Sequence, residues 1–240
     1  MKGIEWSFYE NLDNAKTDFN NLRKEWEKLK STGDFKYADY TEEKLNEIEF
    51  MLYHSEFDDN MRMMKSLDMV NEIRKVHFTG KLKLSFILSF SNSSDKIIQF
   101  SKYCSELSDK EYWKNLSLAY TMQDYNEVSY EIVLALFNAN KADKECLMDK
   151  EELDFFNDLP DTFTIYRAMT VKEKKSNRFR FSWTLNREVA EDFLERNSML
   201  YDDEMTIHDI QVNKKDVVAY LNSRNEEEII YLQSNNNQTA

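Results

Sequence analysis

The sequence predicts an α+β protein, in which a helical N-terminal part precedes a mixed β-sheet. Three observations support this class. Apolar residues recur every three or four positions through the first half of the chain. The only proline, Pro160, marks a change of pattern, and short runs that alternate apolar with polar residues follow it. Helices and strands are therefore expected in separate parts of the chain.

Two long helices are expected at the N-terminus. The first extends from Ile4 to about Lys30, has apolar residues along one face, and ends at Thr32-Gly33-Asp34. The second extends from about Thr41 to Ile73 and is rich in methionine and glutamate. We interpret its methionine stripe as core packing rather than as a special binding surface. No strand is expected before about Asp158.

Shorter helices are expected between Gly80 and Asn140. One segment follows Gly80, and the polar cluster 91–95 separates it from a helix that carries Ile97, Phe100 and neighbouring apolar residues. Ser108 and Glu111 have the spacing of a capping box, which predicts the start of another helix. A further helix is expected over about residues 127–140.

After Pro160 the sequence favours strands, because its runs are short and rich in β-branched and aromatic residues. One helix is expected among them, from about Arg187 to Arg196, capped by Asn186. The expected strands are Thr162–Met169, a run containing Phe179, Phe181 and Trp183, and residues 206–212, 217–221 and 229–232.

These patterns divide the chain into a helical N-terminal region, residues 1–100, a second domain, residues 101–233, and a disordered polar tail, residues 234–240. The N-terminal helices have three open interpretations: they recognise a target, bind a neutralising partner, or cover the second domain.

Composition excludes several classes of function. The chain has 240 residues and a formal net charge of -13, which disfavours a broad basic face for nucleic acid. It has no leader-like segment or spanning run, so we expect a cytoplasmic protein that does not enter membranes. Cys104 and Cys146 are expected to be free thiols. Its three histidines lack the spacing of metal ligands, so no metal site is expected.

Three polar groups lie in or beside the expected strands, where a buried polar group needs a partner or a ligand. Arg167 ends the first strand with donors suited to a phosphate or carboxylate. Ser182 and Thr184 are two residues apart and therefore share one face of a strand. Glu226 and Glu228 have the same spacing. Each has an ordinary alternative: a surface ion pair, a solvated hydroxyl, or an acidic turn.

In this order, the three groups resemble the ADP-ribosyltransferase family, specifically its arginine-serine-glutamate class in the phage and bacterial branch. That class has an arginine on its first core strand, a Ser-x-Ser or Ser-x-Thr element on a following strand, and a Glu-x-Glu element opening a late strand. The resemblance covers about residues 158–233, through "TIYRAM", "FSWTLNREVAEDFLERN" and "DVVAYLNSRNEEEIIYL". Ala168 departs from the glycine that many relatives have after the arginine.

The resemblance implies an ADP-ribosyltransferase core for residues 101–233, with NAD as co-substrate. Glu228 would be the catalytic carboxylate at the ribose, and Glu226 would serve an acceptor arginine. Arg167 would hold the cofactor's phosphates, while Ser182 and Thr184 would support the same face. Tyr166 and Phe193 are further expected cofactor contacts, with Phe193 or Trp183 near the nicotinamide.

The implied activity is mono-ADP-ribosyl transfer to a macromolecule, in a toxin, a phage effector or a defence protein. Protein arginine is the leading acceptor, and nucleic acid is the second. Two alternatives remain: an NAD glycohydrolase, in which water replaces the acceptor, and a catalytically inactive module that only binds a partner.

Overall fold

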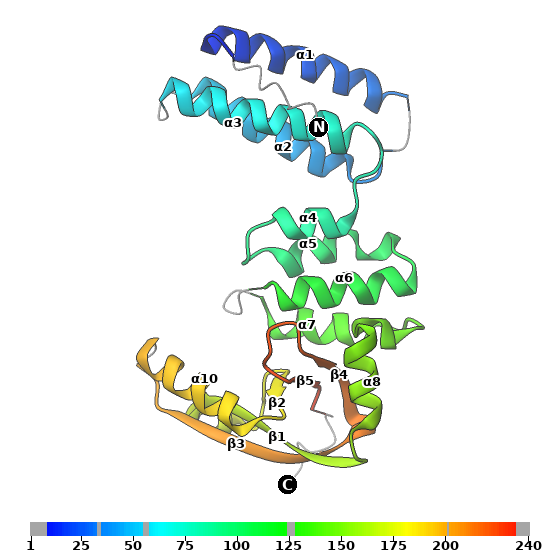
Figure 1. The fold of residues 1–240 in the computed structure, drawn as a ribbon, viewed down its shortest axis with the longest axis vertical. Coiled ribbons are helices and arrows are strands. Elements are labelled where there is room, and N and C mark those ends of the chain that lie inside the picture. The colour runs from blue at the N-terminus through cyan, green and yellow to red at the C-terminus, as the bar shows by residue number, and fades with distance from the viewer. Residues whose placement is uncertain (1–8, 33–34, 55–57, 124–127, 201, 234–240) are drawn as a thin grey trace, which may run out of the picture. The chain divides into compact units, whose positions relative to one another are not determined.

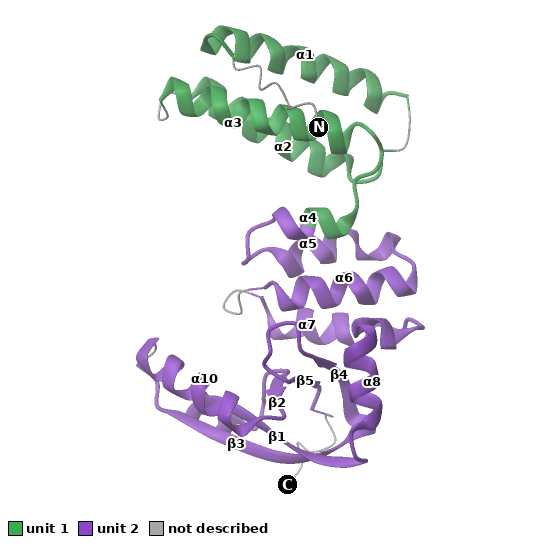
Figure 2. Cartoon of the chain, viewed as in Figure 1, with its two compact units in different colours: residues 1–87 green, residues 88–240 purple. Residues whose placement is uncertain are grey.

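The computed structural model describes residues 9–32, 35–54, 58–123, 128–200 and 202–233 (Figure 1). The chain divides into two compact units, residues 1–87 and residues 88–240 (Figure 2). The division falls earlier than the expected boundary at residue 100. The expected tail, residues 234–240, lies outside the described residues.

Unit 1 consists mainly of three helices, α1 (Leu12–Lys30), α2 (Ala38–Tyr53) and α3 (Asp59–Glu72), followed by a π-helical turn, Ile73–His77. Asn11 caps α1 by accepting a hydrogen bond from the Asn14 amide at 3.0 Å. The end of this helix was predicted correctly, and the expected residues 4–8 lie outside the described part.

The single long helix expected over residues 41–73 is wrong, because α2 and α3 are separate helices. Asp58 starts the second one by accepting a hydrogen bond from the Met61 amide at 3.0 Å. Apolar periodicity continues through both helices, and it cannot distinguish one long helix from two that share a core.

The core of unit 1 is formed by buried side chains from all three helices. Trp26 is fully buried, and its ring stacks on Phe78 with the centroids 5.6 Å apart. The cluster confirms the helical faces expected for this region, and it consists of Ala15, Phe19, Leu22, Trp26, Leu45, Ile48, Leu52, Val70 and Ile73.

Unit 2 begins with helices. The short helix α4 (Leu84–Phe90) crosses the division between the units, and α5 (Lys96–Tyr103), α6 (Asp109–Thr121), α7 (Tyr130–Phe137) and α8 (Lys150–Asp158) follow. The Ser108–Glu111 capping box of α6 is confirmed. Helix α8 was not predicted, although Asp149 and Glu152 form a second capping box at its start. Short 3₁₀ turns occupy Cys104–Glu106, Lys144–Leu147 and Lys214–Asp216.

The rest of unit 2 contains a five-stranded sheet with the order β3-β1-β2-β5-β4. Every neighbouring pair is antiparallel, so the expectation of a mixed sheet is wrong, while the α+β class holds. Alternating side chains predict strands but not their direction, which depends on the connections. The strands are β1 (Thr162–Thr170), β2 (Ser182–Thr184), β3 (Met205–Asn213), β4 (Val217–Leu221) and β5 (Glu228–Tyr231).

The second strand is shorter than expected, because Phe179 and Phe181 lie outside it. Both rings pack instead: Phe179 meets Trp183 edge-on at 5.6 Å, and Phe181 stacks on Tyr130 at 4.5 Å. Their alternation therefore reflects burial, although the Phe181 carbonyl still accepts a hydrogen bond from the Tyr231 amide of β5 at 2.9 Å.

Two more helices accompany the sheet, α9 (Val171–Ser176) and α10 (Arg187–Leu200). Helix α10 packs on β1, β2 and β3, and α8 packs on β4 at the other end of the sheet (Figure 1). The cap predicted for α10 is confirmed, since the Asn186 side chain accepts from the Glu188 amide at 2.9 Å. No helix in the described ranges is long and apolar enough to cross a membrane.

Candidate functional site

The three polar groups singled out in the sequence lie on three adjacent strands of unit 2. Arg167 is on β1, Ser182 and Thr184 are on β2, and Glu228 is the first residue of β5. Strand β2 lies between the other two. Thr184 is opposite both Tyr166 and Glu228 in the strand register, so these side chains share one face of the sheet.

Glu228 is the most buried acidic residue of this group. Its side chain is only 4% exposed, and it pairs with Arg224 across 2.9 Å between Nη2 and Oε2. The Ser182 hydroxyl also donates a hydrogen bond to this carboxylate. Burial raises the pKa of Glu228, while Arg224 and Ser182 oppose that rise and the charge of Glu226 adds to it. A buried carboxylate with a raised pKa in a polar cluster is a candidate for catalysis.

Glu226 lies just before β5 and joins the same cluster through Arg224. The Arg224 Nε atom is 3.0 Å from Oε2 of Glu226, so one guanidinium bridges both glutamates. Arg224 was not among the residues predicted for the site. Arg224 is close in sequence to both glutamates, but the bridge depends on the turn that precedes β5.

The turn that carries these residues has an unusual backbone. Asn225 and Glu227 have positive φ angles of 57° and 45°, which are uncommon for residues other than glycine. The Asn222 side chain accepts a hydrogen bond from the Glu227 amide at 3.0 Å, and its carbonyl accepts from the Asn225 amide at 2.9 Å. The amide of Asn222 in turn donates to Glu152 of α8 at 2.7 Å. These bonds hold the turn in its strained form.

The segment from β2 to α10 fixes the other side of the turn. The Thr184 hydroxyl donates to the Glu226 carbonyl at 2.8 Å and accepts from the Asn186 amide at 3.0 Å. The Leu185 amide donates to the Glu227 carbonyl at 3.1 Å. Thr184 is therefore committed to the backbone of the turn and sets the position of the two glutamates.

Arg167 is linked to the site through the main chain of β2. Its Nη1 donates to the Ser182 carbonyl at 2.6 Å, and its Nε donates to Glu173 of α9 at 3.1 Å. The register places it on the face of β1 opposite to Tyr166, beside His208 of β3. Within the described part of the chain, no hydrogen bond or ion pair joins Arg167 to Glu228, and no residue accepts from its Nη2.

The two expected aromatic contacts differ in position. Tyr166 is half-buried and lies on the same face of the sheet as Thr184 and Glu228. It is opposite Thr184 in the strand register, and Thr184 is in turn opposite Glu228. Phe193 lies on α10, where the Arg196 guanidinium is 4.6 Å from its ring. Among the described residues, no hydrogen bond, ion pair or ring contact joins Phe193 to either glutamate, so the structure does not bring Phe193 into this site.

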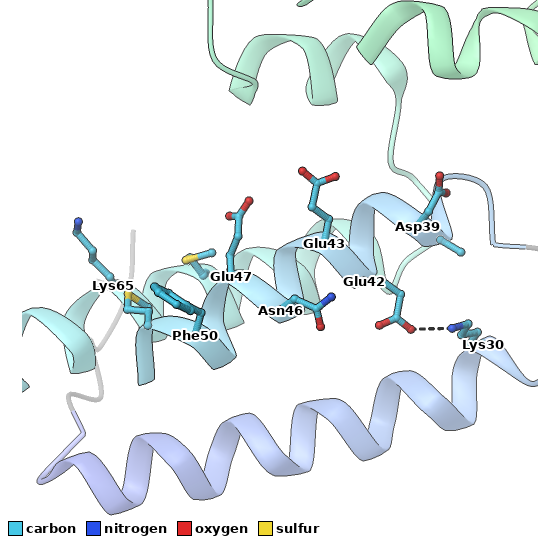
Figure 3. Close-up of a pocket in the computed structure, with 11 residues that line it drawn as sticks. Lys30, Asp39, Glu42, Glu43, Asn46, Glu47, Phe50 and Lys65 are labelled. Atoms are coloured by element: carbon cyan, nitrogen blue, oxygen red, sulfur yellow. Dashed lines mark hydrogen bonds and ion pairs between the residues drawn. The ribbon is translucent and has the colours of Figure 1, made fainter. Parts of the chain in front are cut away.

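Unit 1 contains a groove of about 1210 Å³ along α2. Figure 3 shows Asp39, Glu43 and Glu47 projecting from one side of this helix, with Phe50 nearer its end. Lys65 and Met69 line the groove from α3. The groove therefore combines an acidic side with apolar side chains.

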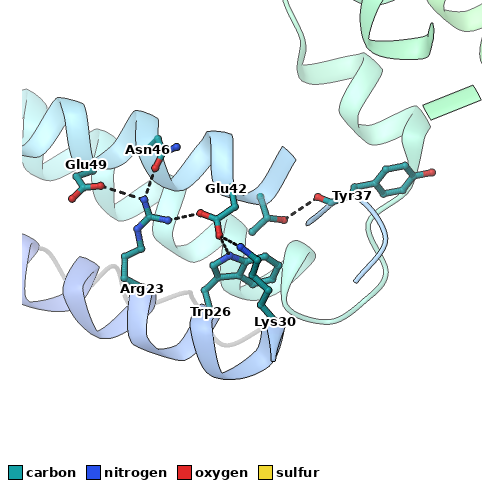
Figure 4. Close-up of polar contacts among 8 residues, drawn as sticks. Arg23, Trp26, Lys30, Tyr37, Glu42, Asn46 and Glu49 are labelled. Carbon is teal, nitrogen blue, oxygen red and sulfur yellow. Dashed lines mark hydrogen bonds and ion pairs between the residues drawn. The ribbon is translucent and has the colours of Figure 1, made fainter. Parts of the chain in front are cut away.

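A second arginine-centred network joins α1 to α2 (Figure 4). The Glu42 carboxylate accepts hydrogen bonds from Arg23 Nη1 at 2.7 Å, Trp26 Nε1 at 2.8 Å and Lys30 at 2.7 Å. Arg23 also pairs with Glu49 at 3.2 Å. Burial opposes ionisation of Glu42, but these hydrogen bonds outweigh it and lower the pKa of the carboxyl. This network serves the packing of two helices.

Cys104 and Cys146 are free thiols. Across the described residues, no group of three or more histidine, cysteine, aspartate or glutamate side chains is arranged to hold a metal ion. Comparisons with protein-family models, with curated proteins and with solved structures found no match.

Proposed function

We propose that unit 2 is a mono-ADP-ribosyltransferase that cleaves NAD and transfers ADP-ribose to a macromolecule. The observation that carries the proposal is the environment of Glu228, which opens β5 as a buried carboxylate bonded to Ser182 and Arg224. Strand β5 neighbours β2, which carries Ser182, and β2 in turn neighbours β1, which carries Arg167.

Glu228 supplies the electrostatic part of this chemistry. Cleavage of a bond between a ribose and its leaving group develops positive charge on the sugar, as in glycoside hydrolysis. A carboxylate fixed in a water-poor environment stabilises such charge without reorganisation. In the proposed reaction Glu228 also accepts a hydrogen bond from the ribose 2'-hydroxyl.

Ser182 and Arg224 favour the ionised form of Glu228 that this role requires. Burial favours the neutral carboxyl, whereas the proposed chemistry needs the carboxylate. The hydroxyl and the guanidinium both stabilise the charged form, and Ser182 fixes the direction of the side chain. Thr184 supports this role indirectly. Its hydroxyl donates a hydrogen bond to the Glu226 carbonyl and positions the turn before Glu228.

The remaining assigned residues contact the other parts of NAD in this proposal. Arg167 uses Nη2 for the phosphates, because its other two nitrogens bind Ser182 and Glu173. This contact requires its side chain to reach from the opposite face of β1 toward the face of Glu228. Tyr166 lies on the face that Glu228 shares and packs on the cofactor. A contact from Phe193 would require α10 to bring its ring toward the sheet, so we assign this residue the smallest role.

Protein arginine is the acceptor that we propose, with Glu226 as the carboxylate that orients its guanidinium. Glu226 is partly exposed and stands beside the buried Glu228, so an acceptor can reach it from solvent. Transfer to nucleic acid and simple hydrolysis of NAD are the competing outcomes. A role as toxin, phage effector or defence protein rests on the resemblance.

The test is incubation of the purified chain with labelled NAD and a lysate that contains protein and RNA, followed by separate protease and nuclease digestion. Label that depends on Glu228 and is lost with protease supports the proposal. Nuclease-sensitive label moves the acceptor to nucleic acid, and release of nicotinamide without label indicates a glycohydrolase.

A partner-binding module is the second candidate, and the groove of unit 1 favours it. This candidate predicts that neither label nor free nicotinamide forms, and that Glu228→Gln has no effect on any measured activity.

A further inference from the structure

The guanidinium of Arg224 occupies the space between the two carboxylates of the proposed site. Its Nη2 is 2.9 Å from Glu228, and its Nε is 3.0 Å from Glu226. Any other cationic group that binds both carboxylates needs the same position. The site is therefore filled by a side chain of its own turn.

The backbone of the turn is fixed by hydrogen bonds to other elements, whereas the partly exposed Arg224 side chain pairs with two glutamates next to it in the turn and at the start of β5. The carbonyls of Glu226 and Glu227 accept hydrogen bonds from β2 and from the residue after it, and Asn222 is bonded to α8. The Arg224 side chain is 32% exposed. Movement in this region is therefore expected at the arginine side chain rather than at the loop.

Replacement of the Arg224 guanidinium by another cation is energetically more favourable than its departure alone. The contact with the partly exposed Glu226 contributes little, because solvent screens it. Loss of the contact with Glu228 leaves a buried charge without its cation, which is strongly unfavourable. Arg224 can leave at low cost only when another cation replaces it.

We propose that Arg224 is an internal gate on a guanidinium-binding site formed by Glu226 and Glu228, and that an incoming arginine side chain opens the gate by displacing it. The identity of the incoming group rests on the function proposed above. The gate explains how a carboxylate that is only 4% exposed becomes accessible to a substrate.

The test measures binding of agmatine, a small guanidinium compound, to the full chain by calorimetry, and measures nicotinamide release on the same preparations. We expect Arg224→Gln to bind agmatine about tenfold more tightly than the wild type, because the internal competitor no longer keeps most of the sites closed. Arg224→Lys keeps a cation but lacks the planar fork, so we expect an intermediate affinity.

Arg178→Gln is the matched control, since Arg178 forms a surface ion pair with Glu131 and lies outside the site. It should bind agmatine as the wild type does. Adding Glu226→Gln to Arg224→Gln should abolish the gain, because the site then lacks its second carboxylate.

The two proposals fail in different ways. Equal agmatine affinity in the wild type, Arg224→Gln and Arg224→Lys overturns the gate, even if NAD is cleaved. A gain in affinity without nicotinamide release from any variant supports the gate and contradicts the transferase. If Arg224→Gln does not fold, the lysine variant decides the question alone.

Discussion

Each unit of this protein contains an arginine that bridges two glutamates, and the two clusters differ in burial. In unit 1, Arg23 joins Glu42 and Glu49, whose side chains are 26% and 52% exposed. In unit 2, Arg224 joins Glu226 to Glu228, which is 4% exposed. The pKa of Glu42 is lowered, while the pKa of Glu228 is raised by burial.

The difference in burial and pKa between Glu42 and Glu228 distinguishes a structural ion-pair network from a candidate active site. Glu42 has enough hydrogen bonds to offset its burial, so its charge stabilises the contact between two helices. At Glu228 the effect of burial outweighs the stabilisation by Arg224 and Ser182, so its charge is costly in the folded state. Such a carboxylate gains most from a substrate that brings positive charge.

Glu228→Gln tests the unit 2 side of this comparison and should have the largest effect. We expect nicotinamide release from NAD to fall about a hundredfold to a thousandfold, because a fixed electrostatic stabiliser is lost. The fold should persist, since the substitution removes a buried charge. Normal turnover in the folded variant would break the comparison.

Glu226→Gln sharpens the comparison within unit 2. We expect transfer to arginine to fall about a hundredfold, because the acceptor loses the carboxylate that orients or deprotonates it. Nicotinamide release in water should persist, since Glu228 remains. Product analysis of labelled NAD with and without agmatine measures both rates, and parallel loss of the two would contradict separate roles for the glutamates.

Acid should destabilise unit 1 through His77, which is buried and hydrogen-bonded to the Thr41 hydroxyl at 3.1 Å. Burial, and then the charge of Lys44, lowers the pKa of His77 from 6.5 to about 4. Between these values the unfolded chain binds the extra proton, so the free energy of unfolding decreases as pH falls from 6.5 to 4. The expected loss is about 3 kcal/mol.

Urea unfolding of the wild type and of His77→Gln between pH 4 and pH 7 measures this effect. Carboxylates titrate in the same range in both proteins, so the difference between the two curves isolates the histidine. Curves with the same pH dependence would show that His77 is not buried in its neutral form.

Glu42→Gln should have the smallest effect. The amide oxygen still accepts from Trp26, but the charged contacts with Arg23 and Lys30 are lost. We expect the free energy of unfolding to decrease by about 1 kcal/mol, with nicotinamide release unchanged. Loss of release in this variant would show that the N-terminal cluster also supports activity.

Local chemistry made much of the fold predictable from the sequence. The Ser108 capping box, the Asn186 cap and the alternation in β1 each act within a few residues, and each prediction is confirmed. The break at Asp58 and the antiparallel sheet were not predicted, because both depend on which elements pack together.

The candidate site was predictable in its composition but not in its connections. The sequence placed Ser182, Thr184 and Glu228 on strands, and the structure brings them together. It gave no indication that Thr184 binds the turn or that Arg167 pairs with Glu173. Arg224 was not predicted as a site residue, because its contacts with Glu226 and Glu228 depend on the fold of the turn.

The most direct test of the central claim is nicotinamide release from NAD by the purified wild type, Glu228→Gln and Glu42→Gln at neutral pH, without any acceptor. We expect release by the wild type and by Glu42→Gln, with a loss of about a hundredfold or more in Glu228→Gln. Equal release by all three folded proteins would contradict a catalytic role for Glu228, and no release by any of them would contradict NAD cleavage by this chain.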